Sequence, residues 1–264
     1  MTAPLSLFID SAAPSVVAAF AASLPASVRV STTLGDSVVV HGGSDWPERV
    51  ADAIGKGARR ILILDPCANG AVLFGPVVAL AEKRGVRITL SETHADNPAT
   101  VQVGEWLGET FGVHTITGQG EDSLADLVLQ QLRIVRATGL HGLELDNAVT
   151  SPDAVVATLS ATLADTPVML RLTAARTVAG PAHHALMAHA PDASASLVLY
   201  SGPAARPAEA MRMTGEGGHC LPTIYEHAHR ASLRAMVAGA DGTADDIRHW
   251  LGDAAMARAI AASG

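Results

Sequence analysis

The chain has 264 residues, of which 48% are hydrophobic and 3% aromatic, and its formal net charge is −8. This length and hydrophobic content are enough for one large or two small folded domains, and they exclude an intrinsically disordered chain. Acidic residues outnumber basic ones by 26 to 18, and no basic run occurs. Binding to nucleic acid is therefore not expected, because phosphate contacts need clustered Lys and Arg.

Cysteine usage and the N-terminus indicate the compartment. Cys67 and Cys220 are the only cysteines, too few for a disulfide framework. The first ten residues lack the basic segment and long apolar core of a signal peptide. No apolar run approaches the roughly 20 residues that a membrane span needs. The sequence predicts a cytoplasmic protein that does not cross a membrane.

The N-terminal part alternates apolar, β-branched runs with helical patterns. Segment 36–68 is the clearest: a Val-rich strand stops at His41-Gly42-Gly43, a helix follows from Trp46, and a second apolar strand ends before Asp65-Pro66. We expect strands at 5–9, 28–31, 38–40, 61–64 and 86–90, with helices at 15–24, from about 46 and from about 72. This alternation predicts a largely parallel, Rossmann-like sheet over residues 1–98.

Residues 99–264 follow a different order. An amphipathic helix at 124–137 precedes several strand-like runs that have no helices between them. We expect strands at 142–145, 155–163, 168–173 and 197–200, loops around 183–189 and 217–220, and helices at 224–238 and 244–262. This order predicts an α+β domain with an open, mainly antiparallel sheet and helices on one face.

The run from Asp36 to Leu90 resembles a known family. The order D-S-V-V-V, helix, R-R-I-L-I-L-D-P, helix and R-G-V-R-I-T-L is similar to the end of the nucleotide-binding domain in the glucose-fructose oxidoreductase and inositol dehydrogenase (Gfo/Idh/MocA) family. These enzymes mostly oxidise or reduce sugars and polyols with NAD(P). The resemblance implies a shortened Rossmann-like domain, a second domain with a large open sheet, and oligomers that form through that sheet.

The cofactor-binding turn departs from the family. A dinucleotide turn needs glycines at a helix N-terminus and an acidic residue about 20 positions later. Here the first strand is followed by Asp10, Ser11 and Ala12, which place a carboxylate where a phosphate would lie, and the second strand ends without an acid. We therefore expect no cofactor. An active enzyme would instead hold NAD(P) through the backbone amides of 12–15 and of Gly42 and Gly43.

The family's catalytic positions also differ. The family's E-K-P motif aligns with Leu64-Asp65-Pro66, so Asp65 replaces the lysine. The family's catalytic helix aligns with 125–136 and puts Gln130 at the histidine and Arg133 at the aspartate. A glutamine cannot titrate. Asp65 could instead cap a turn, and Gln130 and Arg133 could form a polar helix face.

Two histidines are further candidates for proton transfer. His41 ends the third strand, at the edge where open α/β sheets bind ligands. His94 follows the fifth strand, between Glu92 and Asp96. One or the other, His41 or His94, would have to handle protons in an active enzyme that lacks the usual lysine and histidine.

Metal and serine-hydrolase chemistry are not expected. The His and Cys residues in 217–220 and 226–229 do not have the spacing of a zinc site, so we predict no metal. No G-x-S-x-G nucleophile turn occurs either.

Three functional hypotheses remain. The first is a degenerate family member that binds a small molecule, or acts as a partner subunit, with weak or lost hydride transfer. It would form a homo-oligomer or a hetero-oligomer with an active paralogue. The alternative is an active NAD(P)-dependent oxidoreductase of a sugar-like substrate. The third is a ligand-free structural subunit of a heteromeric oxidoreductase.

Overall fold

The computed structural model describes residues 4–24, 27–107, 112–201, 206–239 and 244–263. They fold into two compact units. The first unit comprises Met1–Thr93 and His227–Gly252, and the second comprises His94–Glu226 and Asp253–Gly264. The sequence predicted a division after residue 98, which would assign residues 227–252 to the second domain. In the structure residues 227–252 belong to the first unit, and no local sequence pattern indicates this tertiary association.

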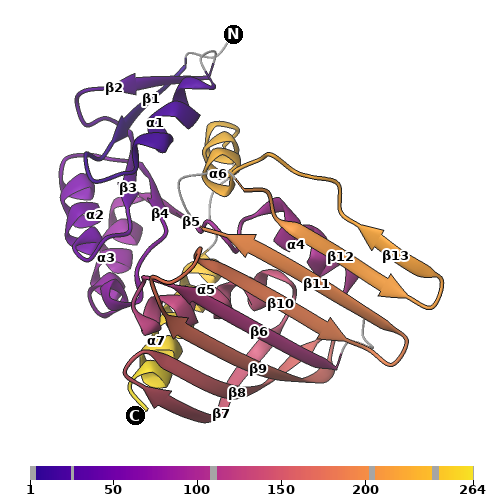
Figure 1. Ribbon diagram of the computed structural model, residues 1–264. Helices are drawn as coiled ribbons and strands as arrows, with labels where there is room; N and C mark the ends of the chain where they lie inside the picture. Colours follow the sequence, from indigo (N-terminus) through magenta and orange to yellow (C-terminus); the bar gives the residue numbers. More distant parts are fainter. Residues whose placement is uncertain (1–3, 25–26, 108–111, 202–205, 240–243, 264) are drawn as a thin grey trace. The chain divides into compact units, whose positions relative to one another are not determined.

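The first unit contains a five-stranded parallel sheet in the order β2-β1-β3-β4-β5 (Figure 1). The strands are β1 (Leu5–Ile9), β2 (Val28–Ser31), β3 (Ser37–His41), β4 (Arg60–Leu64) and β5 (Arg87–Ser91). The direction of strand addition reverses between β1 and β3. Ligands of doubly wound sheets bind at the carboxyl ends of the strands beside such a reversal.

Helices pack against this sheet, and three of them contribute to a buried aromatic cluster. The helices are α1 (Ser15–Ala22), α2 (Trp46–Gly55), η1 (Ala68–Gly70), α3 (Ala71–Arg84), α6 (Ala228–Val237) and the first part of α7 (Ala244–Ala261). Trp46, Phe74 and Trp250 are fully buried and meet edge to face, with ring centroids 4.4–5.8 Å apart. Gly70 packs so closely that a Cβ there would lie 2.1 Å from Trp46. These three aromatic residues therefore serve the core of the first unit.

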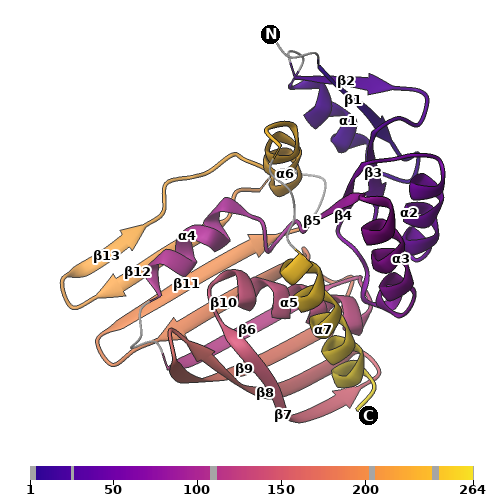
Figure 2. The same cartoon turned by 180° about the vertical axis from the view of Figure 1, so that it is seen from behind.

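The second unit contains an eight-stranded sheet in the order β13-β12-β11-β10-β6-β9-β8-β7. The strands are β6 (Val113–Gly120), β7 (His141–Ser151), β8 (Ala154–Leu163), β9 (Thr166–Arg176), β10 (His183–His189), β11 (Ala193–Tyr200), β12 (Glu209–Thr214) and β13 (Gly217–Cys220). All neighbouring pairs are antiparallel except β6 with β9. Helices α4 (Pro98–Trp106) and α5 (Leu124–Ala137) cover one face (Figure 2).

The expected fold class is confirmed, with corrections in the second unit. Residues 183–189 and 217–220, expected to be loops, form β10 and β13, and residues 224–227, expected to begin a helix, precede α6. Strands β6 and β12 and helix α4 were not expected. Strand β6, with the sequence VHTITGQG, has a weak apolar pattern but pairs along its whole length with both β9 and β10. Such pairing overrides local propensity.

The face of the second sheet opposite α5 carries exposed methionines among polar side chains such as Arg171 and Ser196. We call it the open face and define it by residues that are all exposed: Val113, Met169, Met187, Met211 and Met213.

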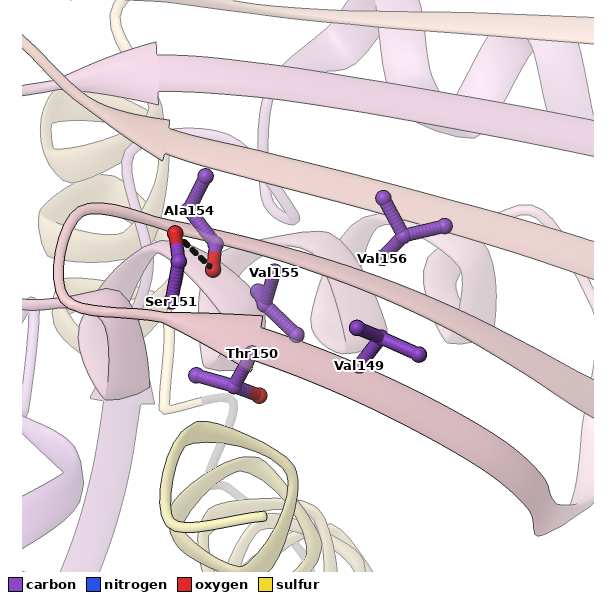
Figure 3. A pocket seen from close by; sticks show the side chains of 6 residues that line it. All are labelled: Val149, Thr150, Ser151, Ala154, Val155 and Val156. Carbon is purple, nitrogen blue, oxygen red and sulfur yellow. Dashed lines mark hydrogen bonds between the residues drawn. The ribbon is translucent and has the colours of Figure 1, made fainter. Parts of the chain in front are cut away.

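A separate pocket of about 210 Å³ lies on the β7–β8 hairpin and is lined by Val149, Thr150, Ser151, Ala154, Val155 and Val156 (Figure 3). No ionisable side chain lines it, so it is not a candidate for acid-base chemistry. No helix in the described ranges is long and apolar enough to span a bilayer.

Candidate functional site

The carboxyl ends of the parallel strands carry the polar side chains of the first unit. Strand β1 leads into Asp10, β3 ends at His41, and β4 leads into Asp65. Strand β5 ends at Ser91, two residues before Thr93. Because carboxyl ends of parallel strands share one edge, these side chains gather where ligands of such sheets bind.

Asp65 is held in a strained turn. Its φ is +44°, a region that few non-glycine residues adopt but that Asp tolerates. Its amide donates to the carbonyl oxygen of Ser91 at 2.8 Å. Its Oδ1 accepts from the Thr93 amide at 2.7 Å, and its Oδ2 accepts from the Thr93 hydroxyl at 2.8 Å. Strain that surrounding bonds maintain is a feature of functional sites.

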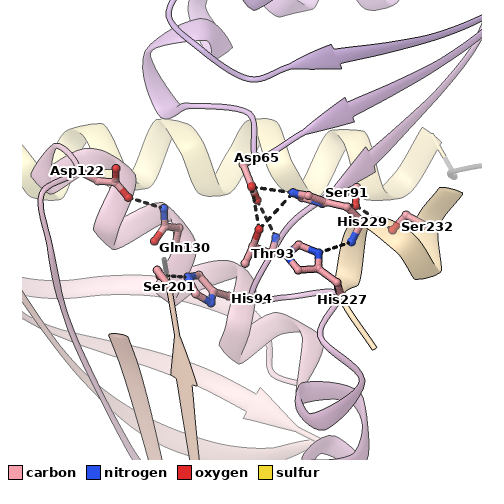
Figure 4. Close-up of polar contacts among 10 residues, drawn as sticks. All are labelled: Asp65, Ser91, Thr93, His94, Asp122, Gln130, Ser201, His227, His229 and Ser232. Carbon is pink, nitrogen blue, oxygen red and sulfur yellow. Dashed lines mark hydrogen bonds and ion pairs between the residues drawn. The ribbon is translucent and has the colours of Figure 1, made fainter. Parts of the chain in front are cut away.

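His229 lies beside this carboxylate although it is 164 residues away in the sequence (Figure 4). Its Nε2 is 2.9 Å from Asp65 Oδ2, and its Nδ1 is 2.9 Å from Ser91 Oγ. Ser91 Oγ in turn donates to Ser232 Oγ at 2.9 Å. His227, the N-cap of α6, accepts a hydrogen bond from the His229 amide. Sequence reasoning missed His229, because its partners come from a distant part of the chain.

The charges at this edge are tuned by burial and by one another. Burial alone would raise the pKa of the Asp65 carboxyl, but the charge of His229 and hydrogen bonds from His229 and Thr93 hold that pKa well below its usual range. Burial lowers the pKa of His41, and the Asp65 charge opposes this effect in part. Burial also lowers the pKa of His227. Asp65 is thus a stable anion beside imidazoles.

Ser91, His229 and Asp65 together are not a serine-hydrolase triad. A nucleophilic serine must face its substrate. Here Ser91 is 0% exposed, whereas the Asp65 side chain is 39% exposed. The accessible end of the network is the carboxylate, so a ligand would meet Asp65 first.

The first turn does not fit the diphosphate of a dinucleotide. The Ala12 amide donates to Asp10 Oδ1 at 3.1 Å, and the Asp10 carboxylate also forms an ion pair with Arg49. Ser11 and Ala12 are exposed on this turn. The anion that contacts the Arg49 guanidinium is the carboxylate of Asp10, which belongs to the turn itself. A phosphate placed there would meet a like charge and an amide that is already bonded.

The second glycine turn is also occupied by the fold itself. The Gly42 amide donates to the Leu64 carbonyl at 2.6 Å, and the Gly42 carbonyl accepts from the Cys67 amide at 3.0 Å. A Cβ at Gly42 would lie 2.1 Å from the Asp65 carbonyl oxygen. The Gly43 carbonyl accepts from the Trp46 amide at the start of α2. Close packing of two turns therefore accounts for Gly42 without a phosphate.

In the second unit the structure brings Gln130 and His94 to a third residue, His184 of β10. The Gln130 side chain donates to Asp122 Oδ2 at 3.0 Å, and its Oε1 lies 2.8 Å from His184 Nε2. The His94 ring is 4.7 Å from the His184 ring. Figure 4 shows His94 beside Ser201, with the His94 Nε2 2.9 Å from Ser201 Oγ. The sequence did not single out His184 as a partner of Gln130, because 183–189 was expected to be a loop.

His184 is held in the neutral form. It is 2% exposed, and burial, followed by the neighbouring His94 and His183, lowers its pKa well below the usual value. A Cβ on Gly118 would lie 2.4 Å from its Nδ1, so the strand beside it has room only for glycine. A neutral imidazole that donates to Gln130 is part of the polar core.

Arg133 is a structural residue. Its Nη1 lies 3.4 Å from Asp253 Oδ2, and Arg136 donates to the same carboxylate at 2.8 and 2.5 Å. Arg133 is 6% exposed and Asp253 is 1% exposed. Arg133 therefore joins α5 to the C-terminal part of α7 and is not on an exposed polar helix face, the alternative that its spacing suggested.

The described residues contain no group of three or more His, Cys, Asp or Glu side chains that could hold a metal ion. His227 and His229, which would diverge on one helix, have ring centroids 4.9 Å apart because His227 precedes α6. Their neighbours are Asp65 and Phe20.

Known structures share this architecture. No family model matches the chain, and no curated protein matches it. The 3-ketoreductase KijD10 from Actinomadura kijaniata, in complex with NADP and TDP-benzene, aligns with a TM-score of 0.68 and 14% identity over 98% of this chain and 97% of that chain. The UDP-N-acetylglucosamine 3-dehydrogenase GnnA from Acidithiobacillus ferrooxidans aligns with a TM-score of 0.70 and 14% identity over 98% of each chain. The chain has the fold of these enzymes. Both are Gfo/Idh/MocA oxidoreductases, so the resemblance noted in the sequence is confirmed at the level of the fold.

Proposed function

We propose that this protein binds a small polar molecule at the carboxyl edge of its parallel sheet, with Asp65 as the main acceptor of hydrogen bonds from ligand hydroxyl groups. The observation that carries the proposal is the Asp65–His229 pair, whose carboxylate is its accessible end. Sugars and polyols offer the donors that such a carboxylate accepts.

The electrostatics favour binding over base catalysis. A general base works best when its pKa lies near the operating pH. His229 and Thr93 hold the pKa of Asp65 far below that range. Such a carboxylate remains an anion when a ligand hydroxyl approaches, so it accepts a strong hydrogen bond without taking the proton.

The same edge lacks the usual means of holding a dinucleotide. The amides of Ala12 and Gly42 are bonded within the fold, and Asp10 places a negative charge at the first turn. Ser31 ends β2 with its hydroxyl bonded to Thr33, where the ribose-binding acid would be expected. We therefore propose that hydride transfer with NAD(P) is weak or lost.

A second candidate function is an active NAD(P)-dependent oxidoreductase of a sugar-like substrate. The near-full-length similarity to KijD10 and GnnA favours it. KijD10 is a 3-ketoreductase whose structure contains NADP, and GnnA is a 3-dehydrogenase of UDP-N-acetylglucosamine. In that case His41 or His94 would handle the hydroxyl proton, and replacing either by Ala would abolish turnover.

Calorimetric titration of the dialysed protein with NADH and with NADPH separates the two candidates. Absence of heat up to about 1 mM cofactor, which corresponds to binding weaker than about −4 kcal/mol, supports the first. Micromolar binding supports the second and rejects the proposed loss of hydride transfer.

A positive test uses glucose and myo-inositol as probes, with ligand-observed NMR. We expect binding that Asp65→Asn weakens about 10- to 100-fold, the effect of losing a hydrogen bond to a charged group. Asp52→Asn, which removes an exposed carboxylate of α2, should leave binding unchanged. Equal binding by both variants would contradict the role of Asp65. If neither probe binds and neither cofactor binds, the ligand-free structural-subunit hypothesis is favoured.

We also propose that the open face forms the contact in a homo-oligomer or with a paralogous chain. Its support is the group of four exposed methionines, 39–56% exposed, on one face of a sheet. Groups of exposed apolar side chains mark interaction surfaces.

A further inference from the structure

The ion pair between Asp10 and Arg49 lies at the reversal point of the parallel sheet. Asp10 follows β1, and Arg49 lies in the first turn of α2, which follows β3. The two strands are neighbours in the sheet. The Asp10 side chain is 15% exposed and the Arg49 side chain is 20% exposed, so the ion pair is mostly buried but reachable from solvent.

Arg49 is oriented by groups besides Asp10. Its Nη2 donates to the His41 carbonyl at 2.8 Å and lies 3.0 Å from the exposed carboxylate of Asp45. Its Nη1 contacts Asp10 Oδ2. The guanidinium would therefore keep its position if Asp10 lost its charge, because His41 and Asp45 still hold the other nitrogen.

Asp10 makes the contacts that an external oxyanion would make. One carboxylate oxygen accepts from the Ala12 amide, and the other accepts from Arg49. A backbone amide and a guanidinium are the groups that bind phosphate and carboxylate oxygens in proteins.

We infer that the Ala12 amide and Arg49 form an oxyanion-binding site that Asp10 fills internally, which makes Asp10 a specificity-determining residue that rejects phosphorylated ligands. This proposal rests on the proposed function, which places the ligand at this edge of the sheet. It adds that the carboxylate of Asp10 makes the site select uncharged ligands over ligands that carry a phosphate.

A purely structural ion pair makes a different prediction. If the pair only joined β1 to α2, neutralising Asp10 would lower stability and create no affinity for anions. If Asp10 occupies a binding site, neutralising it exposes a guanidinium that is still held by His41 and Asp45, and anion affinity appears.

The test measures binding of inorganic phosphate to the full chain by calorimetry, in Asp10→Asn and in the wild type. Asparagine removes the charge that repels phosphate, and its neutral side chain can turn away so that a phosphate oxygen accepts from the Ala12 amide in its place. We expect Asp10→Asn to bind phosphate at least about tenfold more tightly than the wild type, as expected for one charged hydrogen bond regained. The Nε resonance of Arg49 should shift on titration, which reports binding at this site directly.

Two controls complete the experiment. Asp45→Asn removes a carboxylate from the same guanidinium but from an exposed position, so no phosphate affinity should appear. The double variant Asp10→Asn/Arg49→Met should lose what Asp10→Asn gains. Asp10→Ser replaces Asp10→Asn if the latter does not fold.

Two results would overturn the inference: a folded Asp10 variant that binds phosphate no better than the wild type, or a gain that survives loss of Arg49. Failure of the proposed function shows separately, as unchanged glucose or myo-inositol binding in Asp65→Asn. The two proposals can therefore fail independently.

Discussion

His229 in the first unit and His184 in the second are both buried imidazoles, 5% and 2% exposed, but their surroundings differ. His229 faces the carboxylate of Asp65, whereas His184 faces the amide oxygen of Gln130. His229 helps to lower the pKa of the Asp65 carboxyl, whereas burial lowers the pKa of His184. Burial alone therefore does not identify a functional histidine. In the proposed site, the counter-charge and its access to solvent distinguish His229 from His184.

The carboxylates of the two units show the same difference. Asp65 lies at the strand ends and is partly exposed. Asp253 is buried and forms ion pairs with Arg133 and Arg136. In the first unit, polar groups face the carboxyl edge of the sheet, where we propose that a ligand binds. In the second, they fix helix α5 and the C-terminal part of α7. This comparison can be tested by removing one group at a time.

The largest effect is expected from Asp253→Ala. The substitution leaves Arg133 buried beside Arg136 without their shared carboxylate, and we expect the free energy of unfolding to fall by about 3–5 kcal/mol. Urea denaturation measures this change. The control is Asp153→Ala, which breaks an exposed pair with Arg176 and should cost less than about 1 kcal/mol. Similar losses in both would show that burial does not distinguish these ion pairs.

Asp65→Asn should have a smaller effect on stability, of about 1–2 kcal/mol at pH 7, because solvent screens a partly exposed carboxylate. Asparagine tolerates the positive φ at this position. Because folding lowers the pKa of Asp65, its contribution is complete above the unfolded value of 3.8 and is lost as the pH falls toward the folded value. Denaturation at pH 7 and at pH 3 should show the difference between wild type and variant shrinking. A constant difference would argue against the charged pair.

His184 should make the protein sensitive to mild acid. Its pKa is lowered in the folded state, so below 6.5 the unfolded chain takes up a proton that the folded chain refuses, and stability falls. For one such histidine the loss between pH 6.5 and 5.5 is about 1 kcal/mol. His184→Gln should remove this part of the pH dependence, and His189→Gln, at an exposed position, should not. If the wild-type and His184→Gln profiles coincide, His184 is not held neutral by the fold.

The smallest effect on stability is expected from Met187→Lys on the open face, less than about 0.5 kcal/mol for a surface substitution. We expect the wild type to elute as an oligomer with a mass of at least two chains, and this variant to shift toward one chain, as measured by light scattering. Val72→Lys, which changes an exposed residue of α3, is the matched control. A monomeric wild type would exclude a homo-oligomer through this face.

Part of the site could be predicted from the sequence and part could not. The local patterns placed Asp10, His41 and Asp65 at ends of parallel strands, and the structure confirms that placement. No local pattern indicated that His229 would join Asp65, that His184 would join Gln130, or that Asp253 would neutralise Arg133. Each of these contacts joins segments more than 50 residues apart.

The sequence by itself determined the parallel sheet, because β3 and β4 are short apolar runs that are stable only when buried on both faces, and the amphipathic α5 has its predicted bounds. Tertiary structure alone decided the central strands β6 and β10 and the packing of 227–252 with the first unit. Strand pairing and side-chain packing supply the free energy that these polar, small-residue segments lack locally. The same distant contacts set the charges of Asp65 and His184, so the chemistry of the site follows from the fold.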